Sequence, residues 1–190
     1  MPRKLIRHHV YLIGVNHHLQ FGCCDNEFTQ IEFTKFYNFL LKEVNNRNIL
    51  IIAEEISKDG KQFFCEPIAK TLPEKVAKEL DLRYLPCDPD HEERSLLGIR
   101  DRDSIAHELG ISERPDGKYS TGDQEKINKV AAPDDRKREL FWYEKIKSDL
   151  KLNNPIIFIC GYGHTQFFKK LLQEKGFVVD AQDYTEAIMI

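Results

Sequence analysis

Apolar residues follow two alternating patterns along the chain. Short uninterrupted runs rich in β-branched residues, such as Ile156 to Cys160, are typical of strands buried on both faces of a sheet. Between them, apolar residues recur at the spacing of amphipathic helices. These patterns predict strands at residues 8–13, 49–53, 82–86, 156–160 and 177–181, helices at 26–45, 72–80, 134–150 and 165–175, and helical structure from 92 to about 110. Such alternation indicates an α/β fold, with a three-layer, mainly parallel central sheet flanked by helices.

The length of the chain, 190 residues, is that of one domain with a substantial core. We therefore expect a single α/β domain over residues 1–190. The segment 112–123 is rich in glycine, proline and polar residues. We interpret it as a mobile loop or lid within a candidate insertion at 100–130, although a plain surface excursion fits the composition equally well.

Polar side chains follow four of the predicted strands, at the point where each strand ends. His17 lies in an expected loop at 14–24, and a second Gly-x-x-His pattern ends the strand at 156–160. The candidate residues at these ends are His17, Glu54, Glu55, Asp88 and His164. Because the carboxyl ends of parallel strands share one edge of a sheet, we expect these side chains to lie together.

This mixture of imidazole and carboxylate groups suits a divalent metal ion such as Mn, Fe, Co or Zn. The candidate metal ligands are His17, Glu54, Glu55, Asp88 and His164. A metal with an open position lowers the pKa of bound water toward about 7, and a remaining carboxylate can act as general base. Successive strand residues point to opposite faces, so at most one of Glu54 and Glu55 faces the site, and which one stays open.

Each candidate also has an ordinary structural interpretation. A single histidine is most often a loop or cap residue, and a glutamate pair is most often a solvated strand end. Asp88 begins a common turn and helix-cap pattern, and Gly161 and Gly163 can serve a tight turn that requires positive φ. The joint placement of these residues at four strand ends favours a site.

Arginines on the helix before the strand at 156–160 are candidates for substrate binding. Arg138 can hold an anionic substrate or an oxyanion, and Arg136 and Tyr162 are further substrate-binding candidates. A charge run on a helix is more often a solvated face. Trp142 is expected in the core.

Composition excludes several classes of protein. The net charge of −3 gives no basic field for nucleic acid. No apolar run approaches the roughly 20 residues of a membrane span, and the first residues do not resemble a signal peptide, so we expect a cytoplasmic protein. The five cysteines include no Cys-x-x-Cys pair, which argues against a zinc knuckle or a disulfide framework. The oligomeric state stays open, with a homodimer as one alternative.

The order of these motifs resembles the TraB/Tiki superfamily, which includes erythromycin-esterase-like and ChaN-like proteins. The matching pieces are Gly14-Val-Asn-His17, Glu54-Glu55, Asp135-Arg-Lys-Arg138 and Gly161-Tyr-Gly-His164, and Lys137 stands where the family usually has asparagine. The resemblance implies an α/β fold whose site is formed by the two histidines, the glutamates and the arginine. Its members include metal-dependent proteases, macrolide esterases and iron- or haem-associated proteins.

These observations lead to a cytosolic metal-dependent hydrolase of a small molecule or peptide as the first hypothesis. His17, one of Glu54 and Glu55, and His164 form its catalytic centre, with Asp88 as a further ligand and Arg138 on the substrate. A metal-free esterase with His17 as general base is the near alternative. A non-catalytic carrier of metal, haem or another ligand, and a structural partner that uses the loop at 112–123, are the others.

Overall fold

The computed structural model describes residues 9–22, 30–59, 70–115 and 117–184. These residues form a parallel five-stranded sheet in the order β3-β2-β4-β1-β5. The strands are β1 (His9–Val15), β2 (Ile51–Glu54), β3 (Arg83–Pro86), β4 (Ile156–Gly161) and β5 (Val178–Asp183). The expected α/β class and parallel sheet are confirmed. The continuous apolar runs of the central strands β2 and β4 are buried on both faces, whereas the edge strands β3 and β5 are partly exposed.

The described helices cover both faces of this sheet and extend beyond one edge. They are α1 (His17–Phe21), α2 (Gln30–Arg47), α3 (Leu72–Glu79), α4 (His91–Leu97), α5 (Arg102–Glu108), α6 (Thr121–Lys151) and α7 (Tyr162–Glu174). None of them is long and apolar enough to cross a membrane.

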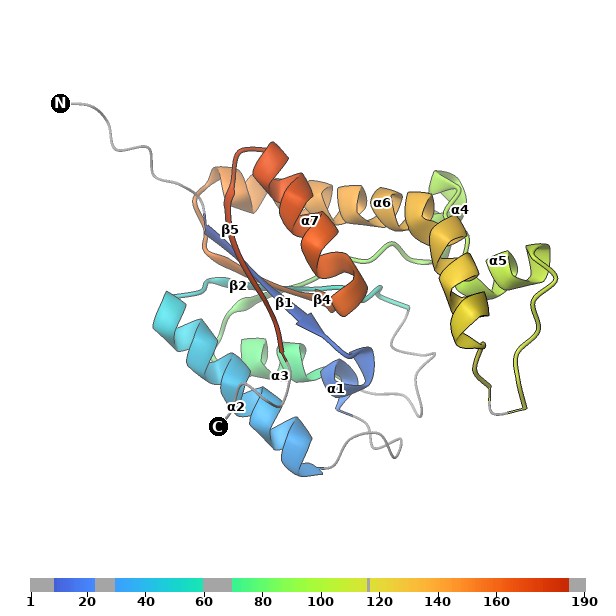
Figure 1. Cartoon of the computed structure of the whole chain (residues 1–190). Coiled ribbons are helices and arrows are strands. Elements are labelled where there is room, and N and C mark those ends of the chain that lie inside the picture. The colour runs from blue at the N-terminus through green and yellow to red at the C-terminus, as the bar shows by residue number, and fades with distance from the viewer. Residues whose placement is uncertain (1–8, 23–29, 60–69, 116, 185–190) are drawn as a thin grey trace.

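Alternate residues of each central strand enter two separate cores. Ile157 and Ile159 of β4 pack on the face covered by α1, α2 and α3, where Phe36 and Leu40 of α2 are fully buried. Phe158 of β4 packs on the opposite face, against Trp142 of α6 and the helix α7. The molecule therefore has three layers, with the sheet between two groups of helices (Figure 1).

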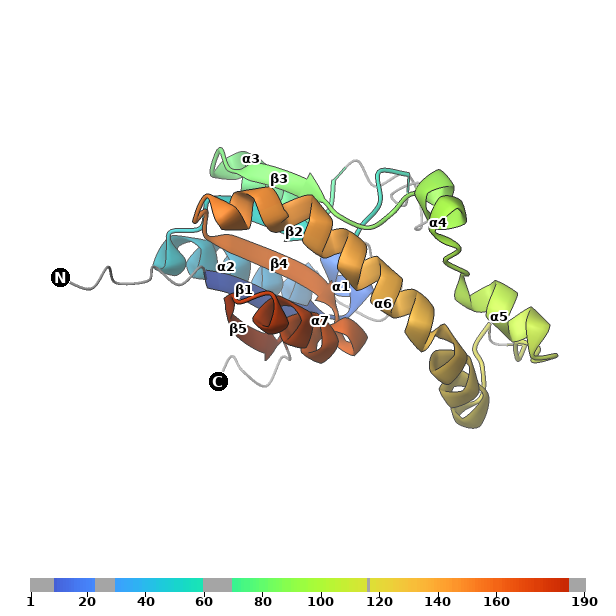
Figure 2. The ribbon, with the colours of Figure 1, turned by 90° about the horizontal axis from the view of Figure 1, so that it is seen from above.

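The sheet order creates a switch point between β1 and β4. The chain leaving β1 crosses to β2 on one side, and the chain leaving β4 crosses through α7 to β5 on the other. In open α/β sheets a crevice opens at the carboxyl ends of strands whose connections diverge in this way, and ligands bind there. Figure 2 shows α4, α5 and the first half of α6 projecting beyond the sheet.

The projecting part differs from the sequence expectation in two ways. The helical stretch expected at 92–110 is two helices, because Gly98 ends α4 with a φ of 59° and Asp101 caps α5 through a hydrogen bond from the Ser104 amide. The helix expected at 134–150 begins at Thr121, so it contains Pro133 and the end of the expected loop at 112–123. Ile127 on this added part packs against Ile105 in a small core of its own, which stabilises the extension.

Two helices near the strand ends also begin earlier than expected. Residues 17–21 form α1 rather than a loop, since the Asn16 side chain accepts a hydrogen bond from the His18 amide and caps the helix. Helix α7 begins at Tyr162 rather than at residue 165. His17 and His164 therefore both lie in the first turns of helices rather than on loops.

Packing of α7 on the sheet gives a first test of the core. We expect Leu172→Ala to lower the free energy of unfolding by about 3 kcal/mol, because this fully buried side chain leaves a cavity. Leu96→Ala is the matched control, since Leu96 lies on α4 with 87% of its surface exposed and its loss should change stability by less than about 0.5 kcal/mol. Urea denaturation of both variants measures the difference, and equal losses would contradict this packing.

Candidate active site

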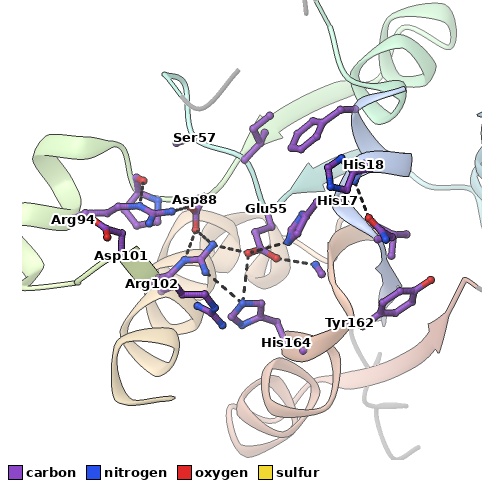
Figure 3. A pocket seen from close by; sticks show the side chains of 18 of the residues that line it. His17, His18, Glu55, Ser57, Asp88, Arg94, Asp101, Arg102, Tyr162 and His164 are labelled. Carbon is purple, nitrogen blue, oxygen red and sulfur yellow. Dashed lines mark hydrogen bonds and ion pairs between the residues drawn. The ribbon is translucent and has the colours of Figure 1, made fainter. Parts of the chain in front are cut away.

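A pocket of about 1080 Å³ opens at the carboxyl ends of β1, β2, β3 and β4. One wall comes from α1 and the start of α7, and the opposite wall comes from α4 and the start of α5. Figure 3 shows His17, Glu55 and His164 pointing toward one another in this pocket, with Asp88, Arg94 and Arg102 on one side and Tyr162 on the other. The pocket lies at the switch point of the sheet.

The two Gly-x-x-His motifs are interlocked. Strands β1 and β4 pair in parallel with Val15 opposite Gly161. A Cβ atom on Gly161 would lie 2.6 Å from Nε2 of His17, and one on Gly14 would lie 2.1 Å from Oδ1 of Asp183 and 2.3 Å from Oγ1 of Thr165. Gly161 therefore leaves room for the histidine of the first motif, and Gly14 leaves room for Asp183 of β5 and for Thr165, which follows the second motif.

The glycines of the second motif do not adopt the positive φ that the sequence suggested for a tight turn. Gly161 has a φ of −61° as the N-cap of α7, and Gly163 lies inside the helix. Neither is among the glycines with positive φ. The alternative that they permit positive φ in a tight turn is wrong, and close approach to His17 explains Gly161.

The structure shows which of the two adjacent glutamates faces the pocket. Glu54 is the last residue of β2 and points toward α1 and α3, where it accepts hydrogen bonds from Gln20 and Thr71. Glu55 points the other way and lines the pocket. The alternation of side chains along a strand produces this division.

Glu55 is buried and surrounded by hydrogen-bond donors and positive charge. Its Oε1 accepts a hydrogen bond from Nη2 of Arg138 at 2.5 Å, and its Oε2 accepts the Gly161 amide at 2.8 Å. Nε2 of His164 lies 3.5 Å and Nε2 of His17 lies 3.8 Å from Oε1. Burial alone would raise the pKa of Glu55, but Arg138, the two histidines and the Gly161 amide together lower it to about 2.

Arg138 on α6 lies at the centre of a buried charge network. Its Nε donates to Oδ1 of Asp88 at 2.9 Å, and its Nη1 lies 3.6 Å from Oδ1 of Asp135. Asp88 also accepts hydrogen bonds from Arg94 and from Nε1 of Trp142. Burial would lower the pKa of Arg138, but the carboxylates of Asp88 and Glu55 outweigh it and raise the pKa above the ordinary arginine value. The charge of Arg138 is thus already balanced by protein carboxylates.

The two histidines differ in exposure and in their partners. The side chain of His164 is 8% exposed, and its Nδ1 lies 3.0 Å from Oε1 of Glu139. The side chain of His17 is 41% exposed, and its Nδ1 lies 3.2 Å from Oε1 of Gln20. Both histidines line the pocket, and His17 is the more accessible of the two to a molecule bound there.

The other substrate-binding candidates have different positions. Tyr162 lines the pocket and donates its hydroxyl to the Tyr184 carbonyl at 2.5 Å. Arg136 is not among the residues that line the pocket; it pairs with Glu139 and lies over the ring of Phe167. Its guanidinium instead helps to fix the partner of His164.

Several residues of the site were missed by the sequence reasoning. They are Gln20, Glu139, Arg94 and Arg102. Gln20 follows His17 by three positions, a spacing that has meaning only on a helix, and a loop was expected there. Glu139 directly follows Arg138 in the motif, and its approach to His164 depends on how α6 packs against α7.

The side chains as placed do not fit the predicted metal ion. Both oxygens of Glu55 and both oxygens of Asp88 are hydrogen-bonded, and the Arg138 guanidinium supplies positive charge beside each. Within the described part of the chain, no group of three or more His, Cys, Asp or Glu side chains is arranged to hold a metal ion. A metal-dependent reaction stays a prediction from the sequence.

Comparison of the chain with family models, with curated proteins and with solved structures found no match in any of the three. The resemblance to the TraB/Tiki superfamily therefore rests on the motifs alone and stays a prediction.

The lowered pKa of Glu55 gives a prediction for stability against pH. Ionised Glu55 stabilises the fold above its ordinary pKa of 4.5, and this contribution, on the order of 3 kcal/mol, is lost as the pH falls toward the folded value of about 2. We expect the difference in unfolding free energy between the wild type and Glu55→Gln to shrink as the pH falls from 4.5 to 2.5, because Glu55 becomes protonated over this range. Urea denaturation along this series measures it, and a difference that stays constant at acid pH would contradict the lowered pKa.

Proposed function

We propose that the protein is a hydrolase that cleaves an ester or a related acyl bond, with His17 as the general base that activates a water molecule. The observation that carries the proposal is an accessible imidazole, 41% exposed, whose Nε2 lies 3.8 Å from a buried carboxylate in a pocket at the switch point of the sheet. A general base must reach the proton that it removes, and His17 is the exposed histidine of the pair.

Glu55 supports this base rather than replacing it. Both of its oxygens are engaged by Arg138 and Gly161, so it is poorly placed to attack a substrate or to accept a proton. Its negative charge stabilises the imidazolium that forms when His17 takes a proton from water. Arg138 holds the carboxylate in place and keeps it ionised.

Substrate recognition belongs to the opposite wall. Arg102 lines the pocket with a side chain that is 42% exposed, and its contacts with Asp135 are long, at 3.3 and 3.4 Å. Its guanidinium is therefore better suited than that of Arg138 to bind an anionic group or a carbonyl oxygen of the substrate. The aromatic side chains of Phe21 and Tyr162 on the other wall suit an apolar portion.

The resemblance to the TraB/Tiki superfamily supports hydrolysis, since esterases and proteases occur among its members. It also keeps the metal-dependent mechanism as the second candidate. One observation favours that candidate: Nε2 atoms of His17 and His164 both lie within 4 Å of Oε1 of Glu55. Arg138 would have to move away from Glu55 for an ion to bind there.

The role of His17 is tested with protein treated with a chelator and a panel of p-nitrophenyl esters of neutral and anionic acids. We expect His17→Ala to lower kcat/KM by about 10²-fold or more, because the general base is lost. His107→Ala is the matched control, since His107 lies exposed on α5 and does not line the pocket. Equal activity in His17→Ala and the control would contradict the proposal.

The metal content of the purified protein is measured separately. We expect protein purified without a histidine tag to contain far less than one equivalent of Mn, Fe, Co or Zn, because the carboxylates are already paired with arginine. Elemental analysis of the wild type beside His17→Ala and His164→Ala decides this. Near-stoichiometric metal that both substitutions abolish would favour the metal-dependent hydrolase over the mechanism proposed above.

A further inference from the structure

The buried side-chain amide of Gln20 connects Glu54 to His17, the histidine that lies beside Glu55. Gln20 on α1 is fully buried, and its side chain lies between His17 and Glu54. One end of the amide lies 3.2 Å from Nδ1 of His17, and the other lies 2.6 Å from Oε1 of Glu54. Glu54 itself is fully buried and faces away from the pocket.

The hydrogen bonds of Glu54 determine which way the Gln20 amide points. Oε2 of Glu54 accepts from the hydroxyls of Thr71 at 2.7 Å and Tyr84 at 2.6 Å. The Thr71 hydroxyl oxygen accepts a hydrogen bond from the Glu74 amide at the start of α3, and its single proton is donated to Glu54. Burial, followed by the charge and hydrogen bond of Glu54, raises the pKa of Tyr84, so its hydroxyl stays protonated and donates.

In the structure, Nε2 of Gln20 donates to Oε1 of Glu54 and the carbonyl oxygen of Gln20 faces Nδ1 of His17. An ionised Glu54, which can only accept, requires this orientation of the amide. A carbonyl oxygen only accepts, so Nδ1 of His17 has to donate. In the neutral ring the other nitrogen, Nε2, then carries the lone pair. Nε2 is the atom that lies beside Glu55.

We propose that Gln20 is a positioning residue that carries the orientation set by Glu54 to His17 and holds its neutral ring in the Nδ1–H tautomer. It rests on the proposed function in one respect: only this tautomer leaves Nε2 free to take a proton from water in the pocket. Glu54, which the sequence suggested as a catalytic residue or metal ligand, thus acts on the site through Gln20.

The second histidine provides an internal comparison. Nδ1 of His164 faces a carboxylate, Glu139, at 3.0 Å, whereas Nδ1 of His17 faces a neutral amide. Glu139 belongs to α6, which packs on the face of the sheet opposite to Gln20 and Glu54. A substitution of Glu139 therefore perturbs a buried partner of one histidine without touching the proposed link to the other.

The tautomer can be read directly by NMR, without any substrate. In full-length protein with ¹⁵N-labelled histidine, long-range ¹H–¹⁵N spectra at a pH where the ring is neutral show which ring nitrogen of His17 is protonated. We expect Nδ1–H in the wild type, and His17→Ala identifies its signals. An Nε2–H ring in the wild type would overturn the proposal.

Two substitutions test the link itself. Gln20→Met keeps the length of the side chain but removes the amide, and Glu54→Gln keeps the shape but allows the Gln20 amide to turn. We expect Gln20→Met to shift His17 to a mixture in which Nε2–H is prominent, and Glu54→Gln to weaken the Nδ1–H preference. Glu139→Gln is the control, and it should alter the signals of His164 and leave the tautomer of His17 unchanged.

If both substitutions leave His17 as Nδ1–H in folded protein, the link is refuted. The activity assay is read separately, with Gln20→Met expected to lower kcat/KM by about tenfold or more, mostly through kcat. An Nδ1–H ring in a protein that hydrolyses no ester would refute the proposed function and leave the link intact. Hydrolysis that needs His17 in a protein whose ring is Nε2–H would refute the link alone.

Discussion

The buried pair of Glu55 and Arg138 is the interaction on which the site depends. Glu55 lies directly after β2, and its carboxylate accepts hydrogen bonds from Arg138 in the middle of α6 and from the Gly161 amide at the end of β4. Asp88 after β3 joins the same guanidinium. Arg138 thus connects the ends of β2 and β3 to α6, and Glu55 connects the end of β4 to the same network. A buried pair of this kind adds little net stability over apolar packing, but the loss of one partner leaves an uncompensated charge.

Most of the fold could be predicted because parallel strands are buried on both faces and show as continuous apolar runs. The order of the strands could not, since nothing in the run from Ile156 to Cys160 tells that it lies between β1 and β2. The first half of α6 was missed for a different reason. It packs against the short helix α5 and the segment that follows α5, so it needs few apolar residues, with Ile127 and Ala131 buried there.

The candidate site was predicted in part. Because parallel strands end at one edge of a sheet, the sequence predicted that His17, His164 and one of the two glutamates would lie together. The structure places the side chains of His17, Glu55 and His164 side by side. The choice between Glu54 and Glu55 depended on the register of one residue, which the sequence does not fix. The partners of the histidines depend on tertiary packing. Gln20 requires a helix where a loop was expected, and Arg138 meets carboxylates from two other segments.

The position of β4 has a consequence for how the molecule is assembled. Strands β1 and β2 both pair with β4 and not with each other, although they come first in the chain. The centre of the sheet therefore cannot close until β4 has been synthesised, about 100 residues after β2 and about 140 residues after β1. Contacts at such sequence separation slow folding, because the entropy of loop closure is lost before the contacts form. The same late strand brings Gly161 against His17, so the pocket cannot be complete before β4 has joined the middle of the sheet.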